Sequence, residues 1–409
     1  MNSTRRTILR GMAAAPLVAT TGGLLVPESA MASQAAQVEA PLTLTYNPAE
    51  TSANVQGIRW LIRKYGGRRY NAATISLARA WQVTNVTAED LNWPTDSPKP
   101  EFVFGWSPND QDANTAHWHP QGVTTYYDAW GRNGKRMMVS WYNKSSSKEG
   151  ARIAVIDRSG NDRRYHYVTL VRAKRSGKDA YTTEALSGLH AGGLAWYRNR
   201  LYVTDSENGA LLVFNTDDLF KPGGDTPYEY AMPLSRIYTA DEASKKRLTF
   251  SQVSVDRTSL QGPIRRTSLI VNSFDNQDPE NRPTYENQIV GRWSFEYNSG
   301  SLQSSGTTAR SSSVYRVNRG SGLPVERGIQ GAVAIRNRLH LSVSDGVGGK
   351  GLFSTVPLNG EGVGTAVATW QVPRGPEDLS YEERSGRGGW VWGLGEYVGN
   401  RHVYAMRVV

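Results

Sequence analysis

The sequence predicts an all-β protein: a five-bladed β-propeller closed by an N-terminal strand, with one short N-terminal helix. Three observations predict this fold. Short alternating strands broken by Gly, Asn, Asp and Ser fill most of the chain, and one strand pattern recurs five times. The last repeat is one strand short of a complete blade.

The N-terminal 32 residues are expected to be a targeting segment outside the fold. The twin arginine Arg5-Arg6 precedes an uncharged run over residues 11–27, and Ala30-Met31-Ala32 has the small residues that a signal peptidase cleaves after. The run is shorter than the ~20 residues of a membrane-spanning helix. A cytoplasmic amphipathic helix is the alternative, and the internal Pro16 argues against it. We therefore expect Tat export, a secreted extracellular protein and no membrane attachment after cleavage.

The remaining chain is expected to hold one domain. Residues 33–48 lack a strand or helix pattern and are interpreted as a tether or an early edge element. A single propeller domain should then span residues 49–409. Within it, apolar residues with helical spacing predict a helix over residues 53–65, which Gly66-Gly67 should end. The chain contains no cysteine, so its stability outside the cell must come from core packing.

Five segments share a small or amide residue followed by an alternating apolar strand. They are residues 121–124, 192–195, 251–254, 330–333 and 377–380. Each is followed by two more strands, which gives the meander of a propeller blade. The fifth unit ends after three strands, and we expect residues 75–84 to add the fourth strand and close the ring. The alternative, two β-sandwiches, does not account for the recurring start.

From Gln121 to the C-terminus, this repeated pattern resembles secreted bacterial propellers of the strictosidine-synthase, gluconolactonase and NHL type. The resemblance implies a propeller, usually of six blades, with Asp, Asn and Glu residues around a central calcium. Glu377 is the position of this chain that matches that set.

The functional residues should lie where the five innermost strands begin, because these starts converge on the central channel. We expect His119, His190 and Glu377 to act there as catalytic acid, base or ligands. Amide and aromatic side chains near the same starts are expected to bind substrate: Gln121, Gln252, Gln330, Trp118 and Tyr126.

The same region offers two kinds of metal ligand. Glu377 and Asp378 have oxygens suited to calcium, while His117 and His119 could bring two imidazoles to one side of a strand and suit zinc. The alternative is a lining of polar groups that satisfy one another through ordered water. Calcium or zinc is thus an expected cofactor, although the sequence requires neither.

The sequence lacks a nucleophile elbow, an HExxH motif, a Walker loop and a dinucleotide glycine pattern, so it identifies no specific reaction. A formal charge of +10 indicates a basic surface, and 12 Trp with 20 Tyr provide faces on which sugars stack. The sequence therefore favours a secreted hydrolase or lyase acting on a small polar or glycan-derived substrate at the central channel. The alternative is a non-enzymatic extracellular binding module for cell-wall polymers or glycans. We expect a monomer whose partner is a small molecule, a glycan or an anionic wall polymer, and not nucleic acid.

Overall fold

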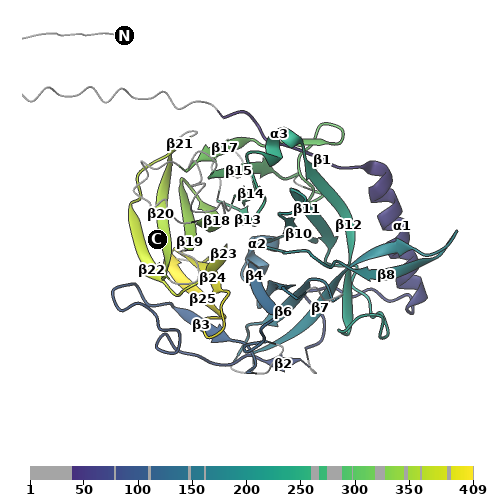
Figure 1. Ribbon diagram of the computed structural model, residues 1–409, viewed down its shortest axis with the longest axis horizontal. Coiled ribbons are helices and arrows are strands. Elements are labelled where there is room, and N and C mark those ends of the chain that lie inside the picture. The colour runs from purple at the N-terminus through teal and green to yellow at the C-terminus, as the bar shows by residue number, and fades with distance from the viewer. Residues whose placement is uncertain are drawn as a thin grey trace, which may run out of the picture. The chain divides into compact units, whose positions relative to one another are not determined.

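Five antiparallel blades surround a central axis in the computed structural model (Figure 1), and some neighbouring blades are hydrogen-bonded to each other through their outer strands. The structure describes residues 39–77, 80–108, 112–145, 149–160, 163–258, 267–273, 288–296, 298–317, 328–344, 349–359, 362–384 and 388–408. The predicted targeting segment, residues 1–32, lies outside the described residues.

Each blade is a four-stranded meander whose first strand lies next to the axis. Blade 1 consists of β4 (Trp118–Thr125), β5 (Arg136–Asn143), β6 (Arg152–Asp157) and β7 (Arg164–Arg175). Blade 2 consists of β9 (Leu194–Tyr197), β10 (Arg200–Asp205), β11 (Ala210–Asn215) and β12 (Tyr230–Ala240). Blade 3 consists of β13 (Gln252–Asp256), β14 (Ser268–Asn272), β15 (Ile289–Ser294) and β17 (Ser313–Arg316). Blade 4 consists of β18 (Gly328–Ile335), β19 (Arg338–Ser344), β20 (Gly351–Asn359) and β22 (Ala368–Val372).

Blade 5 combines the two ends of the propeller domain. Its strands are β23 (Pro376–Glu383), β24 (Gly389–Gly395), β25 (His402–Val408) and the N-terminal β3 (Phe102–Gly105). β3 runs antiparallel to β25, with Phe104 opposite Val403. The predicted five blades and the closure by an N-terminal strand are confirmed, and the edge of the last blade is covered.

The closing strand is not the one that the sequence suggested. Within residues 75–84, the strand among the described residues is β2 (Trp81–Gln82), which pairs with β7 at the outside of blade 1. Residues 75–84 alternate as an edge strand should, but aromatic packing favours β3. The Phe102 ring lies 5.5 Å from that of Trp392 in blade 5, and the Phe104 ring lies 6.2 Å from that of Trp106.

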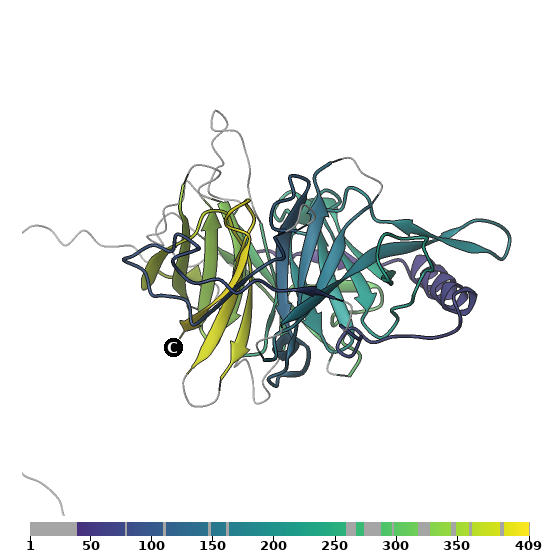
Figure 2. The ribbon, with the colours of Figure 1, turned by 90° about the horizontal axis from the view of Figure 1, so that it is seen from below.

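The predicted helix is confirmed as α1 (Pro48–Lys64), which starts five residues earlier than expected. Asn47 caps its N-terminus by accepting hydrogen bonds from the Ala49 and Glu50 N–H groups. The apolar face of α1 packs on the outside of blades 1 and 2, against β7, β8 (Tyr181–Ala185) and β12 (Figures 1 and 2). The other described helices are the short α2 (Tyr126–Trp130) and α3 (Glu242–Lys245). None of the described helices has the length and apolarity needed to cross a membrane.

Part of the expected tether is a strand that is paired on both sides. β1 (Thr43–Thr45) lies between β12 and β16 (Thr308–Arg310), where Leu44 is opposite both Ala240 and Ala309. Leu42 and Leu44 are fully buried. A three-residue strand is too short to show alternation in the sequence, which explains why this segment looked unpatterned. The remaining short strand, β21 (Gly362–Val363), pairs with β17 and β20.

The inner strands approach one another so closely that the small residues at their starts are required. A Cβ on Gly122 of blade 1 would lie 2.7 Å from the Leu194 nitrogen of blade 2. A Cβ on Gly193 would lie 2.2 Å from the Val253 nitrogen of blade 3. These distances are far below van der Waals contact. The recurring small residue is therefore a consequence of the narrow axis.

Polar side chains of the second strands join each of the first four blades to the next. Each donates to a carbonyl at the start of the neighbouring blade: Ser140 Oγ to Ala191 O (2.7 Å), Thr204 Oγ1 to Ser251 O (3.2 Å), Asn272 Nδ2 to Ile329 O (3.1 Å) and Ser342 Oγ to Glu377 O. Such buried bonds satisfy backbone groups that would otherwise be left unpaired near the axis.

The Asp378 carboxylate closes this network between blade 5 and blade 1. Its Oδ2 accepts hydrogen bonds from Val123 N–H of blade 1 (2.9 Å) and Leu194 N–H of blade 2 (3.0 Å). Its Oδ1 accepts from Gln252 Nε2 of blade 3 and from Leu379 N–H. Gln252 Oε1 in turn accepts from Ala332 N–H of blade 4 (3.0 Å). One buried carboxylate thus links all five blades, directly or through Gln252.

We predict that Asp378→Asn lowers the free energy of unfolding by about 3 kcal/mol, because its amide NH₂ would face N–H donors in a fully buried site. Chemical denaturation measures the change. Asp179→Asn, at an exposed position, is the matched control and should change stability by less than about 0.5 kcal/mol. Equal stabilities of the two variants would show that Asp378 does not hold the ring.

The closure can be tested by cross-linking, because the chain has no native thiol. Arg407 Nε of β25 lies 3.5 Å from Glu101 Oε1 beside β3. Cysteines at these two positions should be joined efficiently by a short bifunctional reagent. Cysteines at Gln82 and Arg407 form the control pair and should not be joined, since Gln82 lies against blade 1. The reverse result would mean that β2 and not β3 covers the last blade.

Candidate active site at the channel mouth

Three of the five inner strands are irregular near their starts. These irregularities shape that end of the channel, which we call the mouth. The register shifts between Pro120 and Val123 in β4, between Ile329 and Gly331 in β18, and between Pro376 and Leu379 in β23. Such bulges bend a strand and re-aim its side chains. The bulged residues include Gln121, Gln330, Glu377 and Asp378.

Six side chains form what we call the channel-mouth cluster: His119, Gln121, Tyr142, His190, Glu377 and Glu396. His119 Nδ1 lies 3.3 Å from Glu396 Oε1, and Tyr142 OH donates a hydrogen bond to the same oxygen (3.3 Å). The Tyr142 ring stacks on the His190 ring at 4.2 Å and lies 5.3 Å from the His119 ring. The predicted convergence of His119 and His190 is thus present, with Tyr142 between them.

The contacts of His190 define its tautomer. Gln121 Nε2 donates to Pro120 O (3.1 Å), which turns the amide oxygen Oε1 toward His190 Nε2 at 2.7 Å. An amide oxygen can only accept, so Nε2 carries the proton and Nδ1 keeps its lone pair. Among the described residues no hydrogen bond reaches Nδ1. His190 is an exposed residue, but desolvation by the protein atoms around its ring lowers its pKa below 6.5. The ring is therefore a neutral base at neutral pH.

Glu377 and Glu396 form a carboxyl pair beside this base. Glu377 is almost fully buried, and burial raises its pKa well above 4.5. The nearby charge of Glu396, that of Asp378 and a hydrogen bond to Glu396 raise it further. Burial and a neighbouring carboxyl group both favour the neutral form of a carboxyl. Glu377 accordingly holds the proton and can donate it.

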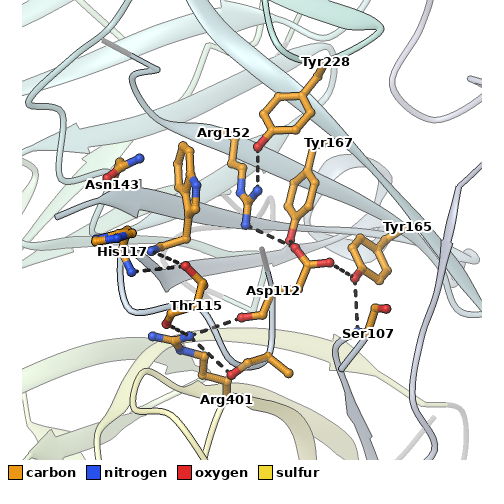
Figure 3. Close-up of polar contacts among 12 residues, drawn as sticks. Ser107, Asp112, Thr115, His117, Asn143, Arg152, Tyr165, Tyr167, Tyr228 and Arg401 are labelled. Atoms are coloured by element: carbon orange, nitrogen blue, oxygen red, sulfur yellow. Dashed lines mark hydrogen bonds and ion pairs between the residues drawn. The ribbon is translucent and has the colours of Figure 1, made fainter. Parts of the chain in front are cut away.

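The loop that leads to His119 is anchored by a buried charged cluster (Figure 3). Asp112 accepts hydrogen bonds from Tyr165 OH (2.5 Å) and Tyr167 OH (2.6 Å), and lies 3.3 Å from Arg152 Nη2. Arg152 is 1% exposed, and its guanidinium lies 4.1 Å from the ring centre of Trp118. Charge pairing and aromatic contact together compensate the burial of this arginine.

Arg401 connects that loop to the carboxyl pair. Its Nη1 donates to the carbonyls of Asp112 (3.2 Å) and Thr115 (2.5 Å) (Figure 3). Its Nε donates to Glu396 O (2.9 Å). Burial lowers the pKa of Arg401 to about 10, so it remains charged at neutral pH. One side chain thus positions both the segment before His119 and the backbone of Glu396.

The residues expected to bind substrate are not all at the mouth. Gln121 belongs to the channel-mouth cluster, and Gln330 is partly buried in the bulge of β18. Gln252 is fully buried, with its amide committed to Asp378 and Ala332, and Trp118 is buried under Arg152. Tyr126 lies at the opposite end of β4, in α2. The last three expectations are therefore wrong, because these side chains stabilise the ring or lie far from the mouth.

The proposed metal ligands are also not assembled. Asp378 has both oxygens occupied by N–H donors. His117 is exposed in the loop before β4, whereas the His119 side chain is 12% exposed and faces Glu396. Within the described residues, no group of three or more His, Asp and Glu side chains could hold a metal ion. His117 and His119 were expected to point to the same side of one strand. They do not, because only His119 lies in the paired part of β4 that faces the mouth.

Sequence reasoning missed two members of the cluster, Tyr142 and Glu396. Tyr142 is directly opposite His119 in the β4–β5 hairpin, so an assigned hairpin register would have indicated it. Glu396 follows β24 in the turn before β25, where no strand pattern marks its position. Its role depends on the turn that brings it beside Glu377.

Comparisons with known proteins bear on the fold of this chain and not on its activity. No family model matches the chain, and no curated protein matches its sequence. Similar solved structures include a GH43_1 enzyme from Xanthomonas citri, at 10% identity and a TM-score of 0.36, with 72% of this chain and 89% of that chain covered. An endo-arabinase from Bacteroides thetaiotaomicron has 11% identity and a TM-score of 0.35, over 66% of this chain and 89% of that chain. A putative 6-phosphogluconolactonase from Bacteroides fragilis has 11% identity and a TM-score of 0.29, over 71% and 90%. Likeness this remote says nothing about activity, and the propeller fold is established by the strand pairing itself.

We predict that Glu396→Gln lowers the pKa of His190 further, because the Glu396 charge is the neighbour that raises it. NMR titration of the histidine ring signals measures this shift. Glu383→Gln is the control, since Glu383 accepts from Tyr127 OH (2.8 Å) at the other end of β23. An unchanged or raised pKa of His190 in Glu396→Gln would contradict the electrostatic arrangement.

Proposed function

We propose that the channel mouth is a general acid–base site of a hydrolase or lyase acting on a small polar or glycan-derived substrate. The observation that carries the proposal is the juxtaposition of a neutral histidine, whose Nδ1 keeps a lone pair, with the buried carboxyl of Glu377, whose pKa is raised beside Glu396. A base and an acid that are both in the required protonation state at neutral pH are the elements of this chemistry.

Each residue of the site has a distinct role in the proposed reaction. His190 Nδ1 removes a proton, from water in hydrolysis or from a carbon next to a carbonyl group in elimination. Glu377 returns a proton to the leaving oxygen, and Glu396 stabilises the arrangement by accepting from Glu377 and Tyr142. Gln121 orients the imidazole, as second groups commonly do for catalytic histidines.

The spacing of the carboxyl groups narrows the reaction. Glycosidases with two catalytic carboxyl groups hold them about 5 to 9.5 Å apart, whereas Glu377 and Glu396 are in hydrogen-bond contact. The pair therefore acts as one acid, and the histidine supplies the base. This favours eliminations and ester or lactone hydrolysis over two-carboxylate glycoside cleavage.

A binding module for cell-wall polymers or glycans is the second candidate. The excess of ten positive charges over negative ones favours anionic polymers as partners. Binding to purified wall material should then weaken steeply with salt and show no turnover.

The remaining proposals rest on the sequence alone. The twin arginine and the cleavage pattern support Tat export and an extracellular location. We also propose a monomer that binds no nucleic acid and does not stay attached to a membrane. A calcium or zinc cofactor would need ligands other than the four residues first considered.

We predict that His190→Gln and Glu377→Gln each reduce kcat/KM by about 100-fold or more, because each removes one proton-transfer group. A panel of lactones and of neutral and uronate oligosaccharides should be assayed for acid release, reducing ends and new double bonds. The pH profile should rise through the pKa of His190, below 6.5, and fall through that of Glu377, above 4.5.

His117→Gln and Glu383→Gln are the matched controls for this experiment. His117 is exposed in the loop before β4, and Glu383 lies at the other end of β23, so both variants should keep full activity. Full activity of the His190 and Glu377 variants would remove these residues from the mechanism.

A further inference from the structure

A second candidate site lies at the opposite end of the propeller from the channel mouth. A cavity of about 340 Å³ opens between blade 5 and blade 1, at the end of β23 and the start of β24. Its lining combines aromatic rings, cations and one carboxylate: Phe102, Asn133, Gly134, Lys135, Arg158, Glu382, Arg384, Trp390 and Trp392. The closing strand β3 contributes Phe102, so the cavity exists only in the closed ring.

One wall of the cavity is aromatic. Trp390 and Phe102 are partly exposed, and their rings are 6.2 Å apart and nearly parallel. The buried Trp392 packs edge-on against Trp390 at 5.7 Å. Partly exposed aromatic rings of this kind offer an apolar surface to the C–H face of a sugar ring.

The other side of the cavity carries excess positive charge. The fully buried Glu382 binds Arg158 Nη1 through Oε2 (2.9 Å) and Arg384 Nη2 through Oε1 (2.9 Å). One carboxylate thus faces two guanidinium groups, and the exposed Lys135 adds a third cation. The described lining therefore has three positive charges and one negative charge.

Arg384 joins the two surfaces. Its guanidinium lies 3.8 Å from the ring centre of Trp390, and its ion pair with Glu382 fixes its orientation. An arginine held in this way has further N–H groups in its planar fork and is preorganised for a second carboxylate. The Asn133 side chain borders the same space and can bind a hydroxyl group, whereas the Gly134 carbonyl accepts a hydrogen bond from Arg158 Nη2 (2.7 Å).

We propose that this cavity binds a carboxylated sugar, the uronate residue of an acidic oligosaccharide. The sugar ring lies against the parts of Trp390 and Phe102 that Arg384 and Arg163 leave uncovered, and its carboxylate pairs with Arg384 and Lys135. The cavity volume is that of a small-ligand pocket. This binding is separate from the acid–base chemistry at the mouth and does not depend on it.

The test is calorimetric titration of the mature protein with trigalacturonate and with its neutral counterpart, trigalactose. Trigalacturonate should bind at least about tenfold more tightly, and Arg384→Gln and Lys135→Gln should each weaken that binding about tenfold, since each removes a charge-assisted hydrogen bond. Arg310→Gln is the matched control: Arg310 is an exposed arginine in a cavity without aromatic residues, and its loss should leave the affinity unchanged.

Three results would overturn the proposal. The first is equal binding of the acidic and neutral trisaccharides. The second is an equal loss of affinity in Arg384→Gln and Arg310→Gln, which would indicate attraction by overall charge. The third is loss of binding in the double variant His190→Gln, Glu377→Gln with normal binding in Arg384→Gln, which would place the sugar at the mouth. Should Arg384→Gln melt at a lower temperature, the exposed Lys135→Gln variant decides the outcome.

Discussion

The buried Asp378 carboxylate is the constraint on which the rest of the structure depends. Four N–H donors, one each from blades 1, 2, 3 and 5, converge on its two oxygens, and burial raises its pKa while these hydrogen bonds oppose that rise. Donors can reach one carboxylate together only if the inner strands lie almost in contact. That requirement leaves no room for a Cβ at Gly122 or Gly193. The width of the axis, and with it the number of blades, follows from this arrangement.

The same constraint positions the chemistry at the mouth. Glu377 precedes Asp378 in the bulge of β23, so the ring holds its backbone where its side chain meets Glu396. Arg401 then links the Glu396 backbone to the loop before His119. The site therefore needs no separate scaffold. Its parts are positioned by contacts that also close the propeller, which is a general way to preorganise a catalytic group.

The repeated strands could be predicted from the sequence, but the contacts between the blades could not. Five inner strands could be recognised because each must begin with small or amide residues, and the convergence of His119, His190 and Glu377 followed from that repeat. The closing strand could not be identified, since residues 75–84 alternate as an edge strand would, whereas the short β3 has no alternation and is selected by its packing on Trp392. Gln252 looked like a ligand-binding amide because its neighbours in space, Asp378 and Ala332, are distant in sequence.

The channel mouth and the cavity between blades 5 and 1 differ in the charged groups that face them, although the chain as a whole is basic. At the mouth, Glu377, whose pKa is raised by burial, lies beside Glu396 and close to His190. A carboxylate placed there would be repelled by Glu396. In the cavity, Glu382 is outnumbered by Arg158, Arg384 and Lys135, and a carboxylate would be attracted. Coulomb energies at such short range in a partly buried site are several times larger than in water. An acidic glycan would therefore be held in the cavity, whereas the group that reacts at the mouth should be uncharged.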